Sequence, residues 1–407
     1  PVWYPVRADG SVDHGAPMLP AESRLPLDPS TDVPDGYAAA QRGEPGGFVG
    51  DPDVMDTWAT SSLTPQIAGG WLDDPDLFAR VFPMDLRPQA HDIIRTWLFS
   101  TVLRSHLEHG ALPWSNAALS GWVLDPDRKK MSKSKGNVVT PMALLEEHGS
   151  DGVRYWAASG RAGVDTVFEA GQMKVGRRLS VKLLNAAKFV LARTGPAGPV
   201  TAPLDRALLE RLAQLVDAST RDFEAYDYAR VLERTEAFFW FFCDNYLELV
   251  KSRRYGDHGE ALAASANTAM LATLSTLLRL FAPFLPFVTD EVWSWWQEGS
   301  IHRSRWPEAA DLRALAGEAA PDDAALDVAV QVLGEIRRKK SEEKKPLKTP
   351  AARVLVVAPR ETLDRLAEVA TDVIAAGLIG ALEQQEGEFR VDVELGELPQ
   401  PTPGSAS

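Results

Sequence analysis

Apolar residues recur at helical spacing along the middle and later parts of this 407-residue chain. The pattern predicts a bundle of helices, each ending where Gly or Pro residues gather. Phe and Trp crowd the third of these helices, so we expect a strongly aromatic bundle core. The predicted helices cover 171–193, 203–224, 228–251, 260–281 and a shorter 289–296.

The residues before the bundle show a mixed pattern, with short apolar runs between amphipathic segments. The run at 116–124 predicts a short buried strand and turn. A helix is predicted to start at Pro141, because Thr140 can act as its N-cap and Pro suits the first helical position. Gly149 predicts the end of that helix. Strand, loop and helix therefore follow in the order that an α/β nucleotide site requires.

The last part of the chain alternates between helix-like and strand-like runs. Helices are predicted over 323–340 and 361–371, and strands over 354–357 and 389–393. The chain therefore reads as a multidomain protein with an α/β part, an all-α bundle, a small α/β unit and a disordered tail. The predicted bounds of these parts are 1–165, 166–310, 322–397 and 398–407.

Composition and charge narrow the class of protein. The net charge of −14 argues against a protein coated with nucleic acid, so any RNA contact must come from local basic patches. No apolar run looks long enough to span a membrane and the first residues lack a signal peptide, which indicates a cytoplasmic protein. The single cysteine, Cys243, excludes an internal disulfide or a multi-cysteine zinc site. Its apolar neighbours predict a buried structural thiol.

The most informative chemical signal is a basic loop between the predicted strand at 116–124 and the helix that starts at Pro141. It reads Lys-Met-Ser-Lys-Ser over 130–134 and continues as Lys-Gly-Asn. Lysine charges can follow phosphate oxygens, and Ser hydroxyls and loop N–H groups add donors, so the loop suits a polyphosphate. A solvated charged loop is the alternative interpretation.

The string at 130–134 is identical to the KMSKS signature, and the chain resembles the class I aminoacyl-tRNA synthetases. Residues 53–62 look like the D-x-x-D-T-W segment of the members that activate branched aliphatic amino acids. Residues 87–97 look like the members specific for valine, and 241–248 resemble the anticodon-binding bundle. The resemblance spans nearly the whole chain and is strongest over 51–156.

This resemblance implies part of a Rossmann-like catalytic domain, followed by an anticodon-binding bundle. It implies a reaction in which ATP, with Mg²⁺, activates valine to valyl-adenylate, and the valyl group then moves to tRNA(Val). No zinc is expected. The implied catalytic residues are Lys130 and Lys133. The implied ATP contacts are Gly121, Lys130, Met131, Ser132, Lys133, Ser134 and His91.

The resemblance also implies contacts to valine from Trp58, Asp92 and Ile93. Asp92 would meet the substrate ammonium, and the other two would line a pocket for a small branched side chain. Without the resemblance, Asp92 reads as the edge of a strand or helix, and His91 reads as a capping or core histidine.

The chain departs from the family pattern in two ways. It contains no His-x-Gly-His string, and no editing domain precedes residues 1–4, which resemble the strand that returns from that domain. We therefore expect a carboxy-terminal section that needs a missing amino-terminal half to form adenylate, from an enzyme that is a monomer when complete. The nearest rival is an isoleucyl- or leucyl-tRNA synthetase section. A non-catalytic tRNA-binding paralogue is a rival of a different kind.

Basic residues late in the chain are the candidates for contact with tRNA phosphates. One pair follows the aromatic helix, and a basic run covers 337–348. A solvated helix end is an equally good interpretation of that run. The candidate residues are Arg253, Arg254, Arg337, Arg338, Lys339 and Lys340.

Overall fold

A computed structural model describes residues 1–53, 58–132, 136–192, 195, 197–317 and 324–397. They form two compact units, Pro1–Ala117 and Ala118–Ser407, which are described separately. The division falls within strand β4 (Trp114–Ser120), earlier than the boundary near 165 that the sequence pattern predicts. It does so because α5 (Pro141–Ala158) packs along α6 (Ala170–Leu191) and joins the preceding segment to the helices. The tail predicted over 398–407 lies outside the described residues.

The Pro- and Gly-rich start of the first unit is organised around two buried aromatic side chains, Trp3 and Phe48. β1 (Trp3–Pro5) pairs antiparallel with β2 (Phe48–Gly50). The Trp3 indole N–H donates to the carbonyls of Pro29 and Asp32, each at 3.2 Å. These bonds fix the irregular segment, which also contains the short 3-10 helices η1 (Glu22–Arg24) and η2 (Ala39–Gln41).

The rest of the first unit is mainly helical. Trp97 is its central residue: its ring stacks on Trp114 with centroids 5.7 Å apart, and the Arg87 guanidinium lies 3.8 Å above it. β3 pairs with β4 in a two-stranded sheet. The elements are α1 (Trp58–Ser61), α2 (Thr64–Ala68), α3 (Pro75–Val81), β3 (Met84–Ala90), the 3-10 turn η3 (His91–Ile93), the π turn η4 (Ile94–Leu98) and α4 (Phe99–His109).

The second unit opens with β5 (Val123–Leu124), which pairs in parallel with β6 (Thr166–Val167). Between them, α5 starts at Pro141 as predicted, although the Thr140 side chain makes no capping hydrogen bond. Gly149 interrupts α5 with φ 76° and ψ 161°, a conformation that favours glycine, so the predicted break is confirmed.

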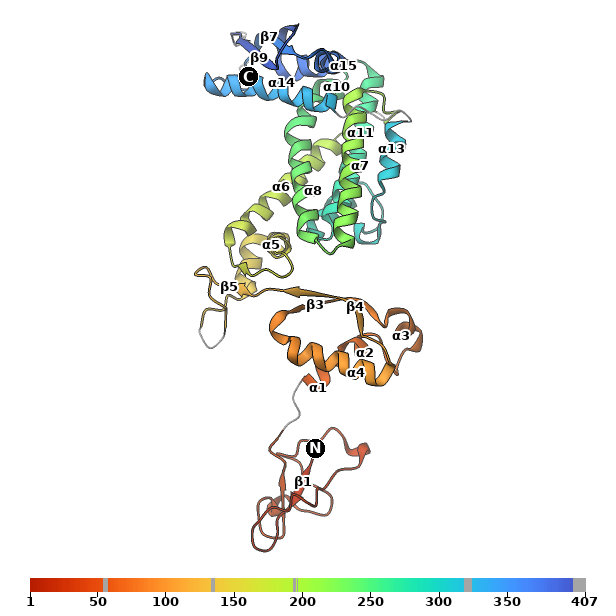
Figure 1. Cartoon of the computed structure of the whole chain (residues 1–407), viewed down its shortest axis with the longest axis vertical. Coiled ribbons are helices and arrows are strands. Elements are labelled where there is room, and N and C mark those ends of the chain that lie inside the picture. Colours follow the sequence, from red (N-terminus) through yellow and green to blue (C-terminus); the bar gives the residue numbers. More distant parts are fainter. Residues whose placement is uncertain (54–57, 133–135, 193–194, 196, 318–323, 398–407) are drawn as a thin grey trace, which may run out of the picture. The chain divides into compact units, whose positions relative to one another are not determined.

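The helical bundle is built from α6, α7 (Pro203–Glu224), α8 (Tyr228–Phe241) and α11 (Glu260–Phe281), which pack side by side (Figure 1). The predicted bounds of α7 and α11 agree with the structure, whereas the predicted helix at 228–251 is divided. A π turn replaces regular helix after α8, and short helices follow it. The further elements are η6 (Phe242–Tyr246), α9 (Leu247–Leu249), α10 (Lys251–Arg254), α12 (Pro286–Ser294), η7 (Ile301–Arg303) and α13 (Ala309–Ala316).

Two sequence predictions about the bundle have clear outcomes. Cys243 is buried in the π turn, and burial raises the pKa of its thiol to about 12, so the predicted structural thiol is confirmed. By length and composition α11 could cross a membrane, so the prediction that no run is long enough is wrong. This helix packs against α6, α7 and α8, and 56% of its most apolar window is buried, as in the core helix of a bundle.

The last part of the second unit is a small α/β layer. Its sheet has the order β8-β7-β9, in which the central β7 (Ala351–Ala358) runs parallel to β8 (Ile379–Glu386) and antiparallel to β9 (Arg390–Leu395). α14 (Ala324–Glu342) and α15 (Arg360–Gly377) pack together, and α14 also packs against α7. β8 was not predicted from sequence, because it is mostly exposed and rich in Glu and Gln.

Candidate functional site

The residues before the basic loop, 119–124, are hydrogen-bonded to the segment 163–168. The N–H of Gly163 donates to the carbonyl of Leu119 at 2.7 Å, and the N–H of Thr166 donates to the carbonyl of Trp122 at 2.8 Å. The Trp122 N–H in turn donates to Asp165 Oδ1 at 2.8 Å. The strand that leads into the loop is therefore fixed along its length.

Gly121 lies where this segment passes very close to the backbone of Val164 and Asp165. A Cβ at this position would lie 2.4 Å from the carbonyl carbon and oxygen of Val164. Any side chain would force 163–166 away and break the parallel pairing. The close approach of Val164 therefore explains the glycine without any ligand, and the ATP contact predicted at Gly121 stays a prediction.

Two polar side chains, Asp125 and Asn137, meet at the base of the basic loop. Asn137 Nδ2 donates to Asp125 Oδ2 at 2.8 Å, and Asn137 Oδ1 accepts the N–H of Ser132 at 2.9 Å. Asp125 Oδ1 accepts the N–H of Lys129 at 2.8 Å. The hydrogen bond from Asn137, followed by that from Lys129, lowers the pKa of Asp125, so this carboxylate is ionised at neutral pH.

The predicted loop residues are placed as far as Ser132. Lys130 is exposed, and its Nζ lies 4.2 Å from the centre of the Trp122 ring, within the range of a cation–π contact. Met131 and Ser132 are half-buried. Lys133 and Ser134 lie outside the described residues, so their roles remain predictions from the sequence alone.

The candidates for valine and adenylate contact in the first unit come from neighbouring elements. His91 and Asp92 are exposed in the 3-10 turn that follows β3, and Ile93 is half-buried beside them. Trp58, also half-buried, opens α1. α1 contacts η4, because the Trp97 indole N–H donates to the last carbonyl of α1 at 2.8 Å. The helix that starts at Trp58, α1, therefore lies against η4, the turn that begins two residues after Asp92.

Arg253 and Arg254 do not form an RNA-binding surface, because each is only 2% exposed. Arg253 Nη1 and Nη2 donate to the two carboxylate oxygens of Asp205 at 2.7 and 2.8 Å, and Nε donates to Asp372 at 2.9 Å. Arg254 packs its guanidinium 4.1 Å from the Phe189 ring. The predicted contact of both arginines with tRNA is therefore wrong. Their acidic and aromatic partners lie far away in sequence, where a local pattern cannot show them.

The basic run on α14 is also less available than its sequence implies. Lys340 is 3% exposed and donates to the carbonyls of Leu347 at 2.9 Å and Gly377 at 3.3 Å, so it is structural rather than RNA-binding. Burial lowers the pKa of this lysine. Arg337 donates to the carbonyl of Asp244, at 2.8 Å. Arg338 and Lys339 are more exposed, but each forms an ion pair with glutamate side chains of α14 or just beyond it.

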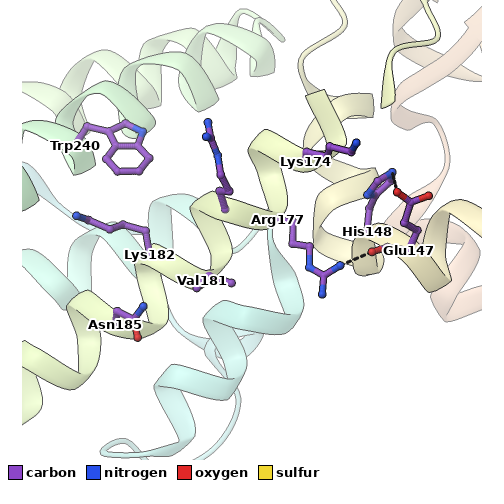
Figure 2. Close-up of a pocket in the computed structure, with 9 residues that line it drawn as sticks. Glu147, His148, Lys174, Arg177, Val181, Lys182, Asn185 and Trp240 are labelled. Carbon is purple, nitrogen blue, oxygen red and sulfur yellow. Dashed lines mark hydrogen bonds and ion pairs between the residues drawn. The ribbon is translucent and has the colours of Figure 1, made fainter. Parts of the chain in front are cut away.

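A cationic face on α6 is a second basic surface, which was not predicted from the sequence. It borders an open cavity of about 650 Å³ between α5, α6 and α8 (Figure 2). Four cations of α6 line this cavity at helical spacing, together with His148 of α5 and Trp240 of α8. Among the residues that the structure describes, Glu147 is the only carboxylate in the lining. The four cations are Lys174, Arg177, Arg178 and Lys182. Their spacing of three and four residues was visible in the sequence, but α6 was interpreted only as a bundle helix.

Three of these cations, Lys174, Arg177 and Arg178, are exposed, and Lys182 is half-buried. Arg177 donates to the carbonyl of Glu147 (Figure 2). The Nζ atom of Lys182 lies 3.4 Å from Asp244 Oδ1 and 5.5 Å from the centre of the Trp240 ring. The Trp240 indole N–H is held by Glu236 at 3.1 Å, which fixes the ring at the cavity wall. The surface can therefore attract an anion and offers an aromatic face beside it.

Comparison with known proteins identifies both parts of the chain. Residues 31–169 match the family described as tRNA synthetases class I (I, L, M and V), and residues 205–356 match the anticodon-binding domain of tRNA ligase. Over 97% of its length the chain is 55% identical to a valine–tRNA ligase of Salinispora tropica and 58% identical to one of Thermobifida fusca. It spans about half the length of these curated relatives, 48% and 45% respectively.

A solved leucyl-tRNA synthetase–tRNA complex from Agrobacterium radiobacter has a similar fold. The TM-score is 0.54 at 20% identity, over 67% of this chain and 35% of that one. At this identity the likeness concerns the fold alone. With the family matches, it confirms the predicted fold class, an α/β catalytic section followed by a helical anticodon-binding domain.

Proposed function

Because this chain belongs to the class I tRNA synthetase family, we propose that it is the carboxy-terminal section of a valine–tRNA ligase. The observation that supports this most is the 55–58% identity to two such ligases along 97% of the chain. The complete enzyme would use ATP, with Mg²⁺ as part of that substrate, to activate valine and then charge tRNA(Val). A cytoplasmic enzyme would follow from this role in translation.

In the proposed first step, a valine carboxylate oxygen forms a bond to the α-phosphorus of ATP, and the bond to the departing pyrophosphate breaks. The protein has little covalent chemistry to perform, so its contribution is positioning and stabilisation of phosphate charge. Lys130 is exposed on a loop whose base is fixed by Asp125 and Asn137, and it is suited to that electrostatic role. Lys133 is proposed for the same role from the sequence resemblance.

Valine is proposed over larger aliphatic substrates on two grounds. The string over 87–97 resembles the valine-specific members, and the two relatives quoted above are valine–tRNA ligases. The exposed carboxylate of Asp92, beside the half-buried Ile93 and near the element of Trp58, supports an ammonium contact next to a small apolar surface.

A chimera tests this proposal. This chain would replace the matching section of the Thermobifida fusca valine–tRNA ligase, and valine-dependent exchange of pyrophosphate into ATP would be measured against the unaltered enzyme. We expect exchange with valine that is faster than with isoleucine or leucine. A preference for either of those substrates would overturn the amino-acid assignment. A folded chimera without any exchange would favour a non-catalytic paralogue.

For tRNA, the cationic face of α6 is the proposed phosphate contact in place of the buried arginines. Lys174, Arg178 and Lys182 are four residues apart, so their Cα atoms are separated by about 6 Å along the helix axis. A row of cations at this spacing can follow successive phosphates of an RNA strand, and counterion release makes such binding salt-dependent. The half-buried Trp240 ring can stack on a base where the strand is unpaired.

Charge reversal on this face should weaken binding of tRNA(Val) to the chain. In the double variant Lys174→Glu and Arg178→Glu, we expect at least a tenfold loss of affinity at about 50 mM salt, and a salt slope of log K reduced by about two. Arg360→Glu with Arg390→Glu makes the same change in net charge on α15 and β9 and should have a much smaller effect. Equal losses in the two double variants would show that net charge, rather than this face, governs binding.

A further inference from the structure

The basic loop is closed at its base by a side-chain pair, Asp125 and Asn137, that lies outside the 130–134 signature. Asp125 is 8% exposed, and a tight turn follows it, in which its backbone N–H donates to the carbonyl of Lys129 at 2.8 Å. Asn137 lies on the far side of the loop, 12 residues later. The bond between the two side chains therefore joins the residues that precede the loop to those that follow it.

We propose that Asp125 and Asn137 are positioning residues that hold the two ends of the basic loop together, so that Lys130 is presented to the triphosphate in a restricted arrangement. The claim that the pair joins the ends of the loop rests on geometry alone. The claim that this helps ATP to react rests on the proposed function. Because the ends are already held together, the loop loses less conformational entropy when ATP binds, and binding costs less free energy. Neither residue contacts substrate in this scheme.

The hydrogen bonds fix which residue donates and which accepts: Asn137 donates to Asp125. Asn137 Oδ1 accepts the N–H of Ser132, while Nδ2 donates to Asp125 at 2.8 Å and to the carbonyl of Lys130 at 3.3 Å. A flipped amide would set its NH₂ group against the Ser132 N–H, so only one orientation satisfies both ends. Asp125 has to be an acceptor on both oxygens, since Lys129 N–H occupies one of them and Asn137 the other.

This pattern predicts the result of exchanging the two side chains. Asp125→Asn must set its NH₂ group against either the Asn137 amide or the Lys129 N–H. Asn137→Asp places two carboxylates against each other, so each single variant should open the loop. In the double variant Asp125→Asn/Asn137→Asp, the new amide donates to the new carboxylate. The Lys129 and Ser132 N–H groups then keep their acceptors. Size and net charge are preserved, and only the longer bond to the Lys130 carbonyl is lost.

The first measurement uses the full chain and needs no enzymatic activity. Limited trypsin digestion would follow cleavage after Arg128, Lys129 and Lys130, with cleavage elsewhere in the chain as the internal control. We expect each single variant to be cut at these sites about tenfold faster, and the double variant to return to within about twofold of the unaltered chain. Unchanged cleavage in the single variants, or a double variant that is cut as fast as they are, would overturn the positioning role.

The second measurement uses the chimera described above and separates this inference from the proposed function. Each single variant should raise the KM for ATP and lower kcat about tenfold while the KM for valine changes little, and the double variant should recover both. If the unaltered chimera does not activate valine, the proposed function fails, and the digestion result still decides the structural part. If it does activate valine and the single variants match it, the positioning role is wrong.

Discussion

Replacing Arg253 with alanine is expected to lower the free energy of unfolding of the second unit by about 3–5 kcal/mol. The arginine is the shared cation of a buried group in which Asp205 also accepts the hydroxyls of Tyr246 at 2.7 Å and Ser265 at 2.6 Å. Without it, the carboxyl groups of Asp205 and Asp372 lose their shared cation in a water-poor environment. Urea denaturation followed by circular dichroism would measure the change.

Two controls make this result specific. Arg360→Ala removes an exposed arginine that pairs with Asp364 one helical turn away, and it should change stability by no more than about 0.5 kcal/mol. Arg253→Lys retains the charge but cannot bond both Asp205 oxygens and Asp372 at once, so an intermediate loss is expected. If Arg253→Ala cost no more than the surface control, the desolvation of the ions would already offset their attraction.

The loss should also depend on pH. Burial raises the pKa of Asp372, while the charge and hydrogen bond of Arg253 oppose that rise. Removing the arginine therefore raises the pKa further, and the carboxyl takes up a proton more readily in the folded variant than in the unfolded chain. Such a group stabilises the fold below its unfolded pKa, and that contribution is lost as the pH rises. The difference between the variant and the unaltered chain should thus shrink from pH 7 toward acid.

The same buried group shows why local patterns fail at particular residues. α7 and α11 were predicted with their observed bounds, because apolar periodicity and helix-ending residues are local signals. Arg253 was interpreted as a surface cation because its partners lie 48 and 119 residues away. Strand β8 was missed for a related reason: its exposed polar residues gain strand structure only from pairing with β7.

For the proposed nucleotide site too, some features could be predicted from neighbouring residues in the sequence, and others arise only when the chain folds. The signature at 130–134 and Asn137 lie within eight consecutive residues, so a loop suited to a polyphosphate could be predicted from the sequence. The pairing of Asn137 with Asp125 depends on how the loop closes, and the need for Gly121 depends on the approach of Val164. Both constraints arise between segments and have no signature of their own in a single sequence.

Among the residues that the structure describes, Lys130 is expected to have the largest effect on the rate of adenylate formation. In the chimera, Lys130→Ala is expected to reduce the single-turnover rate of adenylate formation by about 100- to 1000-fold, the range for loss of one donor to developing charge. The KM for valine should change little, because the lysine charge acts on the phosphates as pyrophosphate departs. Loss of the contact with Trp122 should cost less than about 1 kcal/mol of stability, so the variant should fold.

The neighbouring lysine provides the matched control for this prediction. Lys129 is also exposed, but its Nζ lies 3.7 Å from Asp127 on the turn before the loop, so Lys129→Ala should lower the rate by no more than about threefold. Lys130→Arg keeps the positive charge and should retain more activity than alanine, although the larger planar group alters its geometry. If Lys130→Ala and Lys129→Ala had the same single-turnover rate, Lys130 would be a surface charge. The electrostatic work would then fall to the later lysines of the signature.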